Sequence, residues 1–403
     1  MAQQPLLPVE EARARILSAL HTTEKENVPL AQALGRVLAE EAIARRTQPP
    51  ADLSAMDGYA VRAADVSTVP VRLKVVGMAP AGGAHEENLR EGEAVRIFTG
   101  APLPRGADTI VIQEDTSRDG DIVIVNEAAK AGQHVRVCGL DFRTGDAGMP
   151  VGRKLSPADI ALAAAMNLPL LSVYRRPVIA FFSTGDELVR PGSEPGPNQI
   201  VSSNNDGLAA LIVEAGGIPL DLGIAPDKVG SIRETASRAK DADMLVTLGG
   251  ASVGDHDLVQ EALTPLGLDI DFWKVAMRPG KPLMFGKLGD LPMLGLPGNP
   301  VSALVCATLF LRPAIVRMQG GDSALHTTLA RLGRDLPANG PREDYIRAGL
   351  DHVPGELHVA TPFEIQDSSM LSVLSGASCL IVRPPQAPPL KAGGIVTVLP
   401  LRR

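Results

Sequence analysis

Residues 177–312 alternate between short apolar runs and helical patterns, and this alternation limits the possible folds more than any other feature of the chain. Four runs are predicted as strands: Val178–Phe182, Ile218–Leu222, Met244–Leu248 and Met293–Leu296. Helical patterns such as Leu208–Glu214 and Val229–Ala239 separate them. Strands that alternate with helices form a mostly parallel sheet with helices on both faces. We therefore predict a doubly wound α/β domain.

The segments on either side of this domain have a different pattern. Short β-type runs separated by turns extend from Val61 to about Asp141, and short strands are expected again after Pro313, with 320–342 as a connection. Together they predict a multidomain chain with a small β domain and a C-terminal β-barrel.

Three further stretches predict helices outside the α/β segment. An apolar stripe runs from Val9 to Leu20, and Leu30–Ala44 also has a helical pattern. Ser156, Pro157 and Asp159 match the cap, first-turn proline and acid of a helix that extends to Met166.

Composition argues against several classes of protein. The 403 residues carry 39 basic and 46 acidic side chains, a net charge of −7, and only 3% are aromatic. General nucleic-acid or membrane binding usually requires net positive charge, and base stacking requires aromatic side chains. We expect neither a nucleic-acid nor a membrane partner.

Cysteine usage and the N-terminus favour a cytoplasmic protein. Cys138, Cys306 and Cys379 are odd in number and widely spaced, so they form no disulfide framework and no CxxC metal pair. Acidic residues interrupt the N-terminal region where a secretory signal would be apolar. The apolar stretches Ile160–Val173 and Val301–Leu311 are expected to be too short or too interrupted to cross a bilayer.

Unusual loops follow three of the predicted strands: Ser183–Glu187, Gly249–Asp257 and Pro297–Pro300. Ligands of doubly wound sheets bind outside the carboxyl ends of the strands, so we expect these loops to share a crevice. Asn299 is predicted to cap a helix, whose free amides would favour an anion. Each loop also has a purely structural interpretation: a tight Gly-Gly turn, a helix cap, or acids that face solvent.

Charged residues near these loops suit a phosphate-bearing substrate. Lys274, Arg278 and Lys281 form a basic loop of the kind that binds oxyanions. The carboxylates suited to Mg²⁺ shared with a substrate phosphate are Asp57, Glu187, Asp227 and Asp257. A solvated salt-bridge network is the alternative interpretation of the same residues.

Several common active-site motifs are missing from the sequence. Pro282 stands where a Walker A motif needs Ser or Thr, and Ala251 stands where a dinucleotide fingerprint needs Gly. No Ser-His-Asp or Cys-His arrangement can be argued either. The sequence therefore supports neither an ordinary NTPase nor an NAD enzyme, and it offers no obvious nucleophile.

Six motifs, in order along the chain, resemble one known family. They are Ser54-Ala-Met-Asp-Gly-Tyr59, Thr99-Gly-Ala-Pro102, Ser183-Thr-Gly-Asp-Glu-Leu188, Gly249-Gly-Ala-Ser-Val-Gly254, Pro279-Gly-Lys-Pro282 and Gly295-Leu-Pro-Gly-Asn-Pro300. The chain resembles, along essentially its whole length, the molybdopterin molybdenumtransferases of the MoeA type, relatives of the gephyrin C-terminal E domain. The resemblance implies an enzyme of molybdenum cofactor biosynthesis that inserts molybdate into adenylylated molybdopterin, with Mg²⁺ promoting the release of AMP.

The resemblance also implies an elongated homodimer whose active site is shared between subunits. It implies an N-terminal helix on the α/β domain, a helical linker domain in two pieces, a small β domain, a molybdopterin-binding-like α/β domain and a β-barrel domain. In that order the segments are 1–22, 23–47 with 144–174, 48–143, 175–320 and 321–403.

Site residues follow from the same resemblance, position by position. Those matching catalytic positions are Asp57, Thr99, Glu187, Asp227, Asp257 and Lys274. Glu187, Asp227 and Asp257 are expected to hold Mg²⁺. Those matching substrate or oxyanion positions are Ser252, Arg278, Lys281, Gly298, Asn299, Arg347 and Ser368.

Three alternatives remain at this stage. Arg278 stands where the family commonly has Lys, which leaves a tungstate-inserting paralogue open. A molybdopterin adenylyltransferase would share the α/β domain but usually consists of that domain alone. A non-catalytic scaffold, as in gephyrin, would not need the acids and the basic loop. Other cofactor-biosynthesis proteins, such as the adenylyltransferase, are expected as partners.

Overall fold

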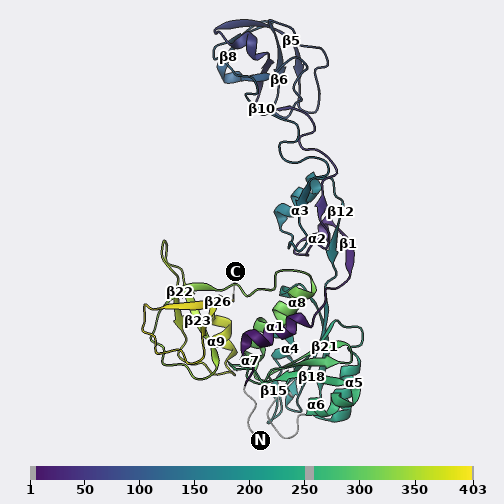
Figure 1. Ribbon diagram of the computed structural model, residues 1–403, viewed down its shortest axis with the longest axis vertical. Helices are drawn as coiled ribbons and strands as arrows, with labels where there is room; N and C mark the ends of the chain where they lie inside the picture. The colour runs from purple at the N-terminus through teal and green to yellow at the C-terminus, as the bar shows by residue number, and fades with distance from the viewer. Residues whose placement is uncertain (1–5, 250–257, 402–403) are drawn as a thin grey trace. The chain divides into compact units, whose positions relative to one another are not determined.

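The computed structural model describes residues 6–249 and 258–401, and the chain divides into two compact units (Figure 1). Unit 1 contains Met1–Glu26, Gly35–Ala39 and Val173–Arg403, and unit 2 contains Asn27–Leu34 and Glu40–Ser172. Each unit has hydrophobic clusters of its own. The finer division into five segments stays a prediction.

A six-stranded sheet forms the centre of the α/β part of unit 1, in the order β16-β13-β17-β21-β20-β18. The bounds are β13 (Val178–Thr184), β16 (Ile218–Ala225), β17 (Met244–Leu248), β18 (Leu268–Trp273), β20 (Met284–Leu288) and β21 (Leu291–Leu296). The four strands predicted from sequence, β13, β16, β17 and β21, pair in parallel. The antiparallel strands β18 and β20 were not predicted. In β18 the exposed Asp269 and Asp271 interrupt the apolar run that marks a buried parallel strand.

Helices cover both faces of this sheet (Figure 1). Alternate side chains of β13 divide between two clusters, with Ile179 and Phe181 in one and Ala180 and Phe182 in the other. Helices of the first cluster are α1 (Val9–Ser18), α4 (Asn204–Glu214), α7 (Pro300–Cys306) and α8 (Arg312–Met318). Helices of the second are α5 (Val229–Ser237) and α6 (Leu258–Leu263). The predicted doubly wound α/β domain is confirmed.

The helical run Pro300–Met318 corrects one expectation. It continues past Pro313, which lies in the first turn of α8, and it ends within the predicted α/β domain (175–320). The run joins α7 to α8 through a π-helical turn at Ala307–Leu311. By length and composition it could cross a membrane, contrary to our expectation for this stretch, but most of it is buried within unit 1 as a core helix.

A closed five-stranded β-barrel forms the C-terminal part of unit 1. Its strands are β22 (Thr328–Leu332), β23 (Glu343–Asp351), β24 (Val359–Pro362), β25 (Cys379–Arg383) and β26 (Ile395–Pro400). Pairing of β23 with β25 closes the ring, and the short β19 (Met277–Arg278) joins β23 from outside. β22 lies in the segment that was expected to be a connection. Tyr345, Leu380 and Leu399 pack into the core cluster of the α/β part. The predicted barrel is confirmed.

Unit 2 is built on a six-stranded sheet in the order β7-β4-β6-β5-β9-β8. Its strands are β4 (Gly58–Val61), β5 (Val71–Ala79), β6 (Glu93–Ile97), β7 (Thr109–Ile112), β8 (Thr116–Asp119) and β9 (Ile122–Val125). Small two-stranded sheets pair β3 (Leu53–Ser54) with β10 (Val135–Arg136), and β2 (Ala42–Ile43) with β11 (Ala147–Met149). β1 (Lys25–Pro29) pairs with β12 (Leu170–Tyr174), and β14 (Leu188–Val189) with β15 (Ile200–Val201) in unit 1.

The remaining helices are short. The predicted helix over Leu30–Ala44 is wrong, because α2 (Leu30–Ala33) ends before Gly35, whose φ of +73° lies outside helical space. The predicted start of α3 (Pro157–Ala165) is confirmed by a capping box between Ser156 and Asp159. α9 (Leu371–Gly376) connects two barrel strands. Short 3₁₀ turns occur at Ala63–Val66, Gln113–Asp115 and Thr264–Leu266.

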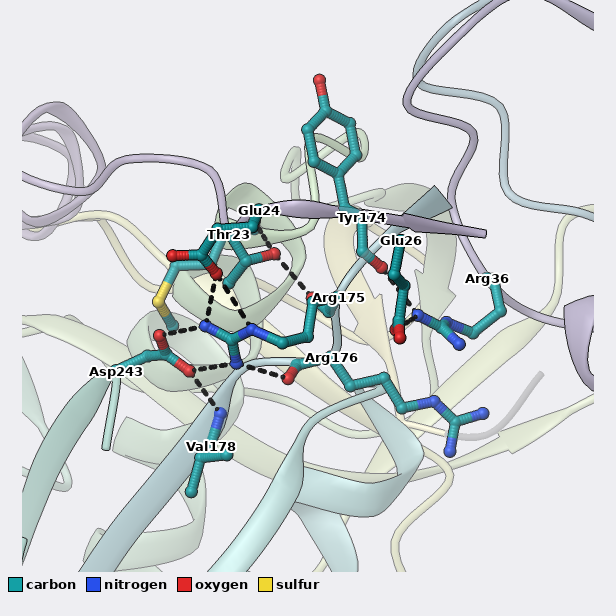
Figure 2. Close-up of polar contacts among 10 residues, drawn as sticks. Thr23, Glu24, Glu26, Arg36, Tyr174, Arg175, Arg176, Val178 and Asp243 are labelled. Atoms are coloured by element: carbon teal, nitrogen blue, oxygen red, sulfur yellow. Dashed lines mark hydrogen bonds and ion pairs between the residues drawn. The ribbon is translucent and has the colours of Figure 1, made fainter. Parts of the chain in front are cut away.

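An arginine network anchors the start of β13 within unit 1 (Figure 2). The Arg175 guanidinium donates to Asp243 at 2.8 and 2.9 Å and to Glu24 at 2.9 and 3.0 Å. Asp243 also accepts the Val178 amide at 2.7 Å. The network therefore fixes where the strand begins, and the opposite end of that strand carries the loop Ser183–Glu187.

Candidate active site

The three loops singled out from sequence line one cavity of about 830 Å³ in unit 1, at the carboxyl edge of the parallel strands. This sheet-edge cavity is lined by Thr184 at the end of β13 and Glu187 after it, by Gly249 after β17, and by the turn Pro297–Pro300 after β21. The predicted crevice is thus confirmed for the described part of the loops. Ser252 and Asp257 lie outside the described residues.

Two asparagines at the start of α4 organise this cavity, and neither was predicted. Asn205 is buried and accepts hydrogen bonds from Ser183 and Ser202 while donating to Asp221 at 3.0 Å. Its neighbour Asn204 lines the cavity and donates to the Gly298 carbonyl at 2.7 Å. The sequence pattern that could have indicated both residues is a pair of asparagines directly after Ser202 and Ser203 at the start of a helix.

The acidic side of the sheet-edge cavity consists of Glu187 and Asp227, as predicted, with Asp186 beside them. Partial burial raises the pKa of Asp227, and the negative charges of Asp186 and Glu187 raise it further. Carboxylates that repel one another are stabilised by a nearby positive charge. Among the described residues no group of three acids, histidines or cysteines is arranged to hold a metal.

The turn before α7 differs from the prediction in its hydrogen bonds. Asn299 occupies the cap position but makes no capping bond, and its Nδ2 donates to Ser368 Oγ at 3.1 Å. The Val301 amide donates to the Ser368 carbonyl at 3.1 Å. The Val301 amide, which was expected to be free to attract an anion, is therefore hydrogen-bonded within the protein. This bond joins α7 to the loop that contains Ser368.

A second cavity of about 650 Å³ lies between the basic loop and the barrel. Arg278, Lys281, Arg347 and Ser368 all line this barrel cavity, so the structure brings four of the predicted oxyanion residues together. Pro282 and Ser302 line both cavities, which makes the two cavities neighbours.

Most charges around the barrel cavity are paired. Three of its carboxylates have a cation of their own: Arg278 with Asp344, Arg334 with Glu364 at 3.1 Å, and Lys391 with Asp335 at 2.7 Å. The fourth, Asp367, accepts two hydrogen bonds from Ser369, which lower its pKa.

Three cations of the barrel cavity differ from these. The side chains of half-buried Lys281 and Arg342 and of buried Arg347 form no ion pair with any described residue. The barrel cavity therefore retains positive charge for an external anion.

The remaining predicted residues lie elsewhere. Lys274 lines neither cavity, and its Nζ lies 4.5 Å from the centre of the Trp273 ring. Gly298 lies in the sheet-edge cavity. Asp57 and Thr99 belong to unit 2, where Asp57 Oδ1 accepts the Thr99 amide and hydroxyl, both at 2.8 Å. These bonds lower the pKa of Asp57, with a smaller contribution from Arg96.

Comparison with known proteins extends over nearly the whole chain. Three family models match: the MoeA N-terminal region (domain I and II) at residues 7–167, a probable molybdopterin binding domain at 180–317, and the MoeA C-terminal region (domain IV) at 329–401. The molybdopterin molybdenumtransferase of Nostoc sp. is 38% identical, over 94% of this chain and 89% of that protein. The chain belongs to the molybdopterin molybdenumtransferase family.

Other members of the family agree in length and fold. The Haemophilus influenzae molybdopterin molybdenumtransferase is 34% identical over 98% of both chains. The crystal structure of the molybdopterin biosynthesis MoeA protein from Pyrococcus horikoshii superposes with a TM-score of 0.86 and 28% identity, covering 98% of this chain and 99% of that one. The prediction of an enzyme of the molybdopterin molybdenumtransferase type, in molybdenum cofactor biosynthesis, is confirmed. The residue assignments within the site stay predictions.

Proposed function

We propose that this enzyme inserts molybdate into adenylylated molybdopterin and releases AMP. The observation that carries the proposal is the pair of adjoining cavities in unit 1, one lined by acids at the sheet edge and the other by uncompensated cations at the barrel. A reaction that joins a small dianion to a phosphate-bearing cofactor needs two such compartments side by side. Family membership supports the same reaction.

The barrel cavity suits the oxyanion. Molybdate is a compact dianion, and Lys281 with Arg347 supplies positive charge, since neither side chain forms an ion pair with a described residue. Holding the dianion beside the second cavity would accelerate its reaction with the pterin ligand by proximity. Ser368, held by Asn299, adds a hydroxyl to the same wall.

The sheet-edge cavity suits the adenylylated pterin and Mg²⁺. Glu187 and Asp227 are hard oxygen donors, and partial burial together with the negative charges of Asp186 and Glu187 raises the pKa of Asp227. These two acids fit a Mg²⁺ ion held jointly with substrate phosphates. When bound, the ion supplies positive charge to the phosphate oxygens. Asn204, Gly249 and Gly298 also line this cavity.

Two of the cysteines, Cys306 and Cys379, take no part as nucleophiles in this proposal. Burial raises the pKa of Cys306 and raises that of Cys379 to about 11. Both side chains therefore stay thiols at neutral pH, and neither lines a cavity.

An assay with purified components tests the reaction. Protein, adenylylated molybdopterin, Mg²⁺ and molybdate are mixed, and AMP release is followed together with formation of the molybdenum-loaded cofactor. We expect AMP release that depends on molybdate. Binding of the adenylylated pterin without release would contradict the proposal, and release with tungstate alone would correct the metal.

We further propose that the enzyme acts as a homodimer in which Asp57 and Thr99 of one subunit complete the site of the other. The resemblance to the family supports this, as does the position of Asp57, half-buried in unit 2 with a carboxylate held ionised by Thr99. Asp57→Ala and Lys281→Ala should each abolish turnover without unfolding the protein.

Mixing these two inactive variants tests the shared site. A heterodimer of Asp57→Ala and Lys281→Ala subunits contains one site without either substitution, so subunit exchange should restore activity. If both residues belonged to the same subunit's site, every site of the mixture would carry one substitution and activity would stay absent.

A further inference from the structure

Gln366 surrounds one side of Arg347 with hydrogen bonds that carry no charge. Its Oε1 accepts both the amide and the Nε of Arg347 at 3.0 Å. Its Nε2 donates to the Arg347 carbonyl at 3.0 Å and to the Phe363 carbonyl at 2.9 Å. One amide side chain therefore fixes both the backbone and the guanidinium plane of this arginine.

The rest of the Arg347 guanidinium is placed for a ligand. Nη1 donates to the Asp367 carbonyl at 2.6 Å, while Nη2 has no hydrogen bond to any described residue. The side chain is only 2% exposed and nevertheless lines the barrel cavity. Burial lowers the pKa of Arg347, and the negative charge of Asp367 opposes this shift only in part.

The carboxylate that acts on this charge is that of Asp367, which forms no ion pair with Arg347 and is held by Ser369 instead. A buried cation that no carboxylate contacts directly costs free energy, and an external anion in the cavity would reduce that cost. A glutamate at position 366 could make the same two acceptor bonds and would neutralise the charge. Glutamine makes these bonds and leaves the charge in place. The contrast with Arg278, which the Asp344 carboxylate neutralises within the same cavity, shows that the two arginines differ in this respect.

We propose that Gln366 is a positioning residue for oxyanion binding: its neutral amide orients Arg347 and keeps the full guanidinium charge available to a tetrahedral dianion in the barrel cavity. This inference rests on the proposed function, because molybdate is the dianion assigned to that cavity. The inference adds Gln366 to the residues of the oxyanion site, as one that contacts Arg347 and not the anion itself.

The substitution Gln366→Glu tests the proposal, since it keeps the size and the acceptor oxygen and adds one negative charge. It also removes the two hydrogen bonds that Nε2 donates to the Arg347 and Phe363 carbonyls, a loss that Gln366→Met shares. Gln366 is exposed, so the variant should fold. We expect the dissociation constant for molybdate, measured by calorimetry on the purified protein without the pterin, to rise at least about tenfold. The KM for molybdate should rise similarly, while kcat at saturating molybdate and the KM for the adenylylated pterin should stay within about twofold.

Two other variants separate charge from structure. Gln366→Met removes the hydrogen bonds without adding charge and should weaken molybdate binding less than Gln366→Glu. Gln386→Glu adds the same charge at an exposed glutamine that lines neither cavity, and it should bind molybdate like the unsubstituted protein.

The outcomes distinguish this inference from the proposed function. If Arg347→Ala loses molybdate binding but Gln366→Glu binds normally, or no more weakly than Gln386→Glu, the role of Gln366 is wrong and the oxyanion site stands. A Gln366→Glu variant that loses kcat with an unchanged dissociation constant also overturns it. If the unsubstituted protein binds no molybdate, the proposed function fails at this step, and the inference fails with it.

Discussion

The pKa of a single residue, Asp227, depends on the charges of the site around it. Its carboxyl lies beside Asp186 and Glu187, and its pKa is raised by partial burial and by these charges. Asp57, in contrast, has a lowered pKa because Thr99 donates two hydrogen bonds to it. A bound cation would therefore stabilise the ionised form of Asp227, whereas hydrogen bonds from Thr99 within unit 2 already stabilise the ionised form of Asp57.

The raised pKa of Asp227 predicts a pH-dependent stability. The folded state binds its proton more tightly than the unfolded state, so the free energy of unfolding falls as pH rises from the ordinary value near 3.8 through the raised one. Asp227→Asn should therefore be more stable than the unsubstituted protein at pH 7, and the difference should vanish below both pKa values. Urea unfolding across this range measures it.

The effect of Mg²⁺ on stability tests whether Asp227 is a ligand of the ion. At pH 7 the ion should stabilise the unsubstituted protein and should have a smaller effect on Asp227→Asn, because one ligand is lost. Asp241→Asn, an exposed aspartate outside both cavities, is the matched control. Equal Mg²⁺ effects in all three proteins would rule out Asp227 as a ligand.

At the scale of elements, the basic loop depends on the helix beneath it. Gly280 has a φ of +104°, and a Cβ at this position would lie 2.3 Å from the Sγ of Cys306 in α7. The backbone of the loop therefore packs directly on the thiol, between Arg278 and Lys281 in the chain.

We predict that Gly280→Ala destabilises unit 1 by about 1–3 kcal/mol and weakens molybdate binding, because the loop must move away from Cys306. In a Cys306→Ala background the same change should cost less, since part of the clash is removed. Chemical unfolding of the four proteins of this double-mutant cycle gives the coupling free energy. Strictly additive effects would contradict the direct contact.

The capping box of α3 gives an element-scale prediction in unit 2. Ser156 Oγ accepts the Asp159 amide, and Asp159 accepts the Ser156 amide at 2.8 Å. Ser156→Ala should lower the free energy of unfolding by about 1 kcal/mol, as for other lost helix caps. Calorimetry measures the change, with the exposed Ser117→Ala in β8 as control. No loss of stability would mean that Asp159 holds the helix start alone.

At the scale of the whole molecule, the chain consists of two units with separate hydrophobic clusters. The cavities assigned to substrates both lie in unit 1. Ligand binding should therefore act on the stability of one unit directly.

We predict that calorimetry resolves two unfolding transitions and that molybdate raises only the one belonging to unit 1. At a molybdate concentration about 100 times its dissociation constant, the stabilisation should be about 2.7 kcal/mol. Lys281→Ala should reduce this shift. A single transition, or an equal shift of both, would show that the units unfold together.

The sequence alone determined the fold class and the loops of the site. Alternating strands and helices required a parallel sheet, and loops after parallel strands meet at one edge, so Glu187, Gly249 and Asn299 could be placed together in advance. Prediction from sequence failed at two places where the local pattern is misleading. Leu30–Ala44 has helical spacing, but the helix ends before Gly35. In β18, two aspartates interrupt the apolar pattern by which a strand is recognised.

Only the tertiary structure decided how charges are paired. Arg278 and Arg347 look alike in sequence, yet Asp344 neutralises the first and the neutral amide of Gln366 holds the second. Ion pairs form between residues 66 positions apart, and the barrel cavity between segments as distant as Arg278 and Ser368. No local pattern encodes such distances, because they depend on how β19 joins β23 and how the barrel closes.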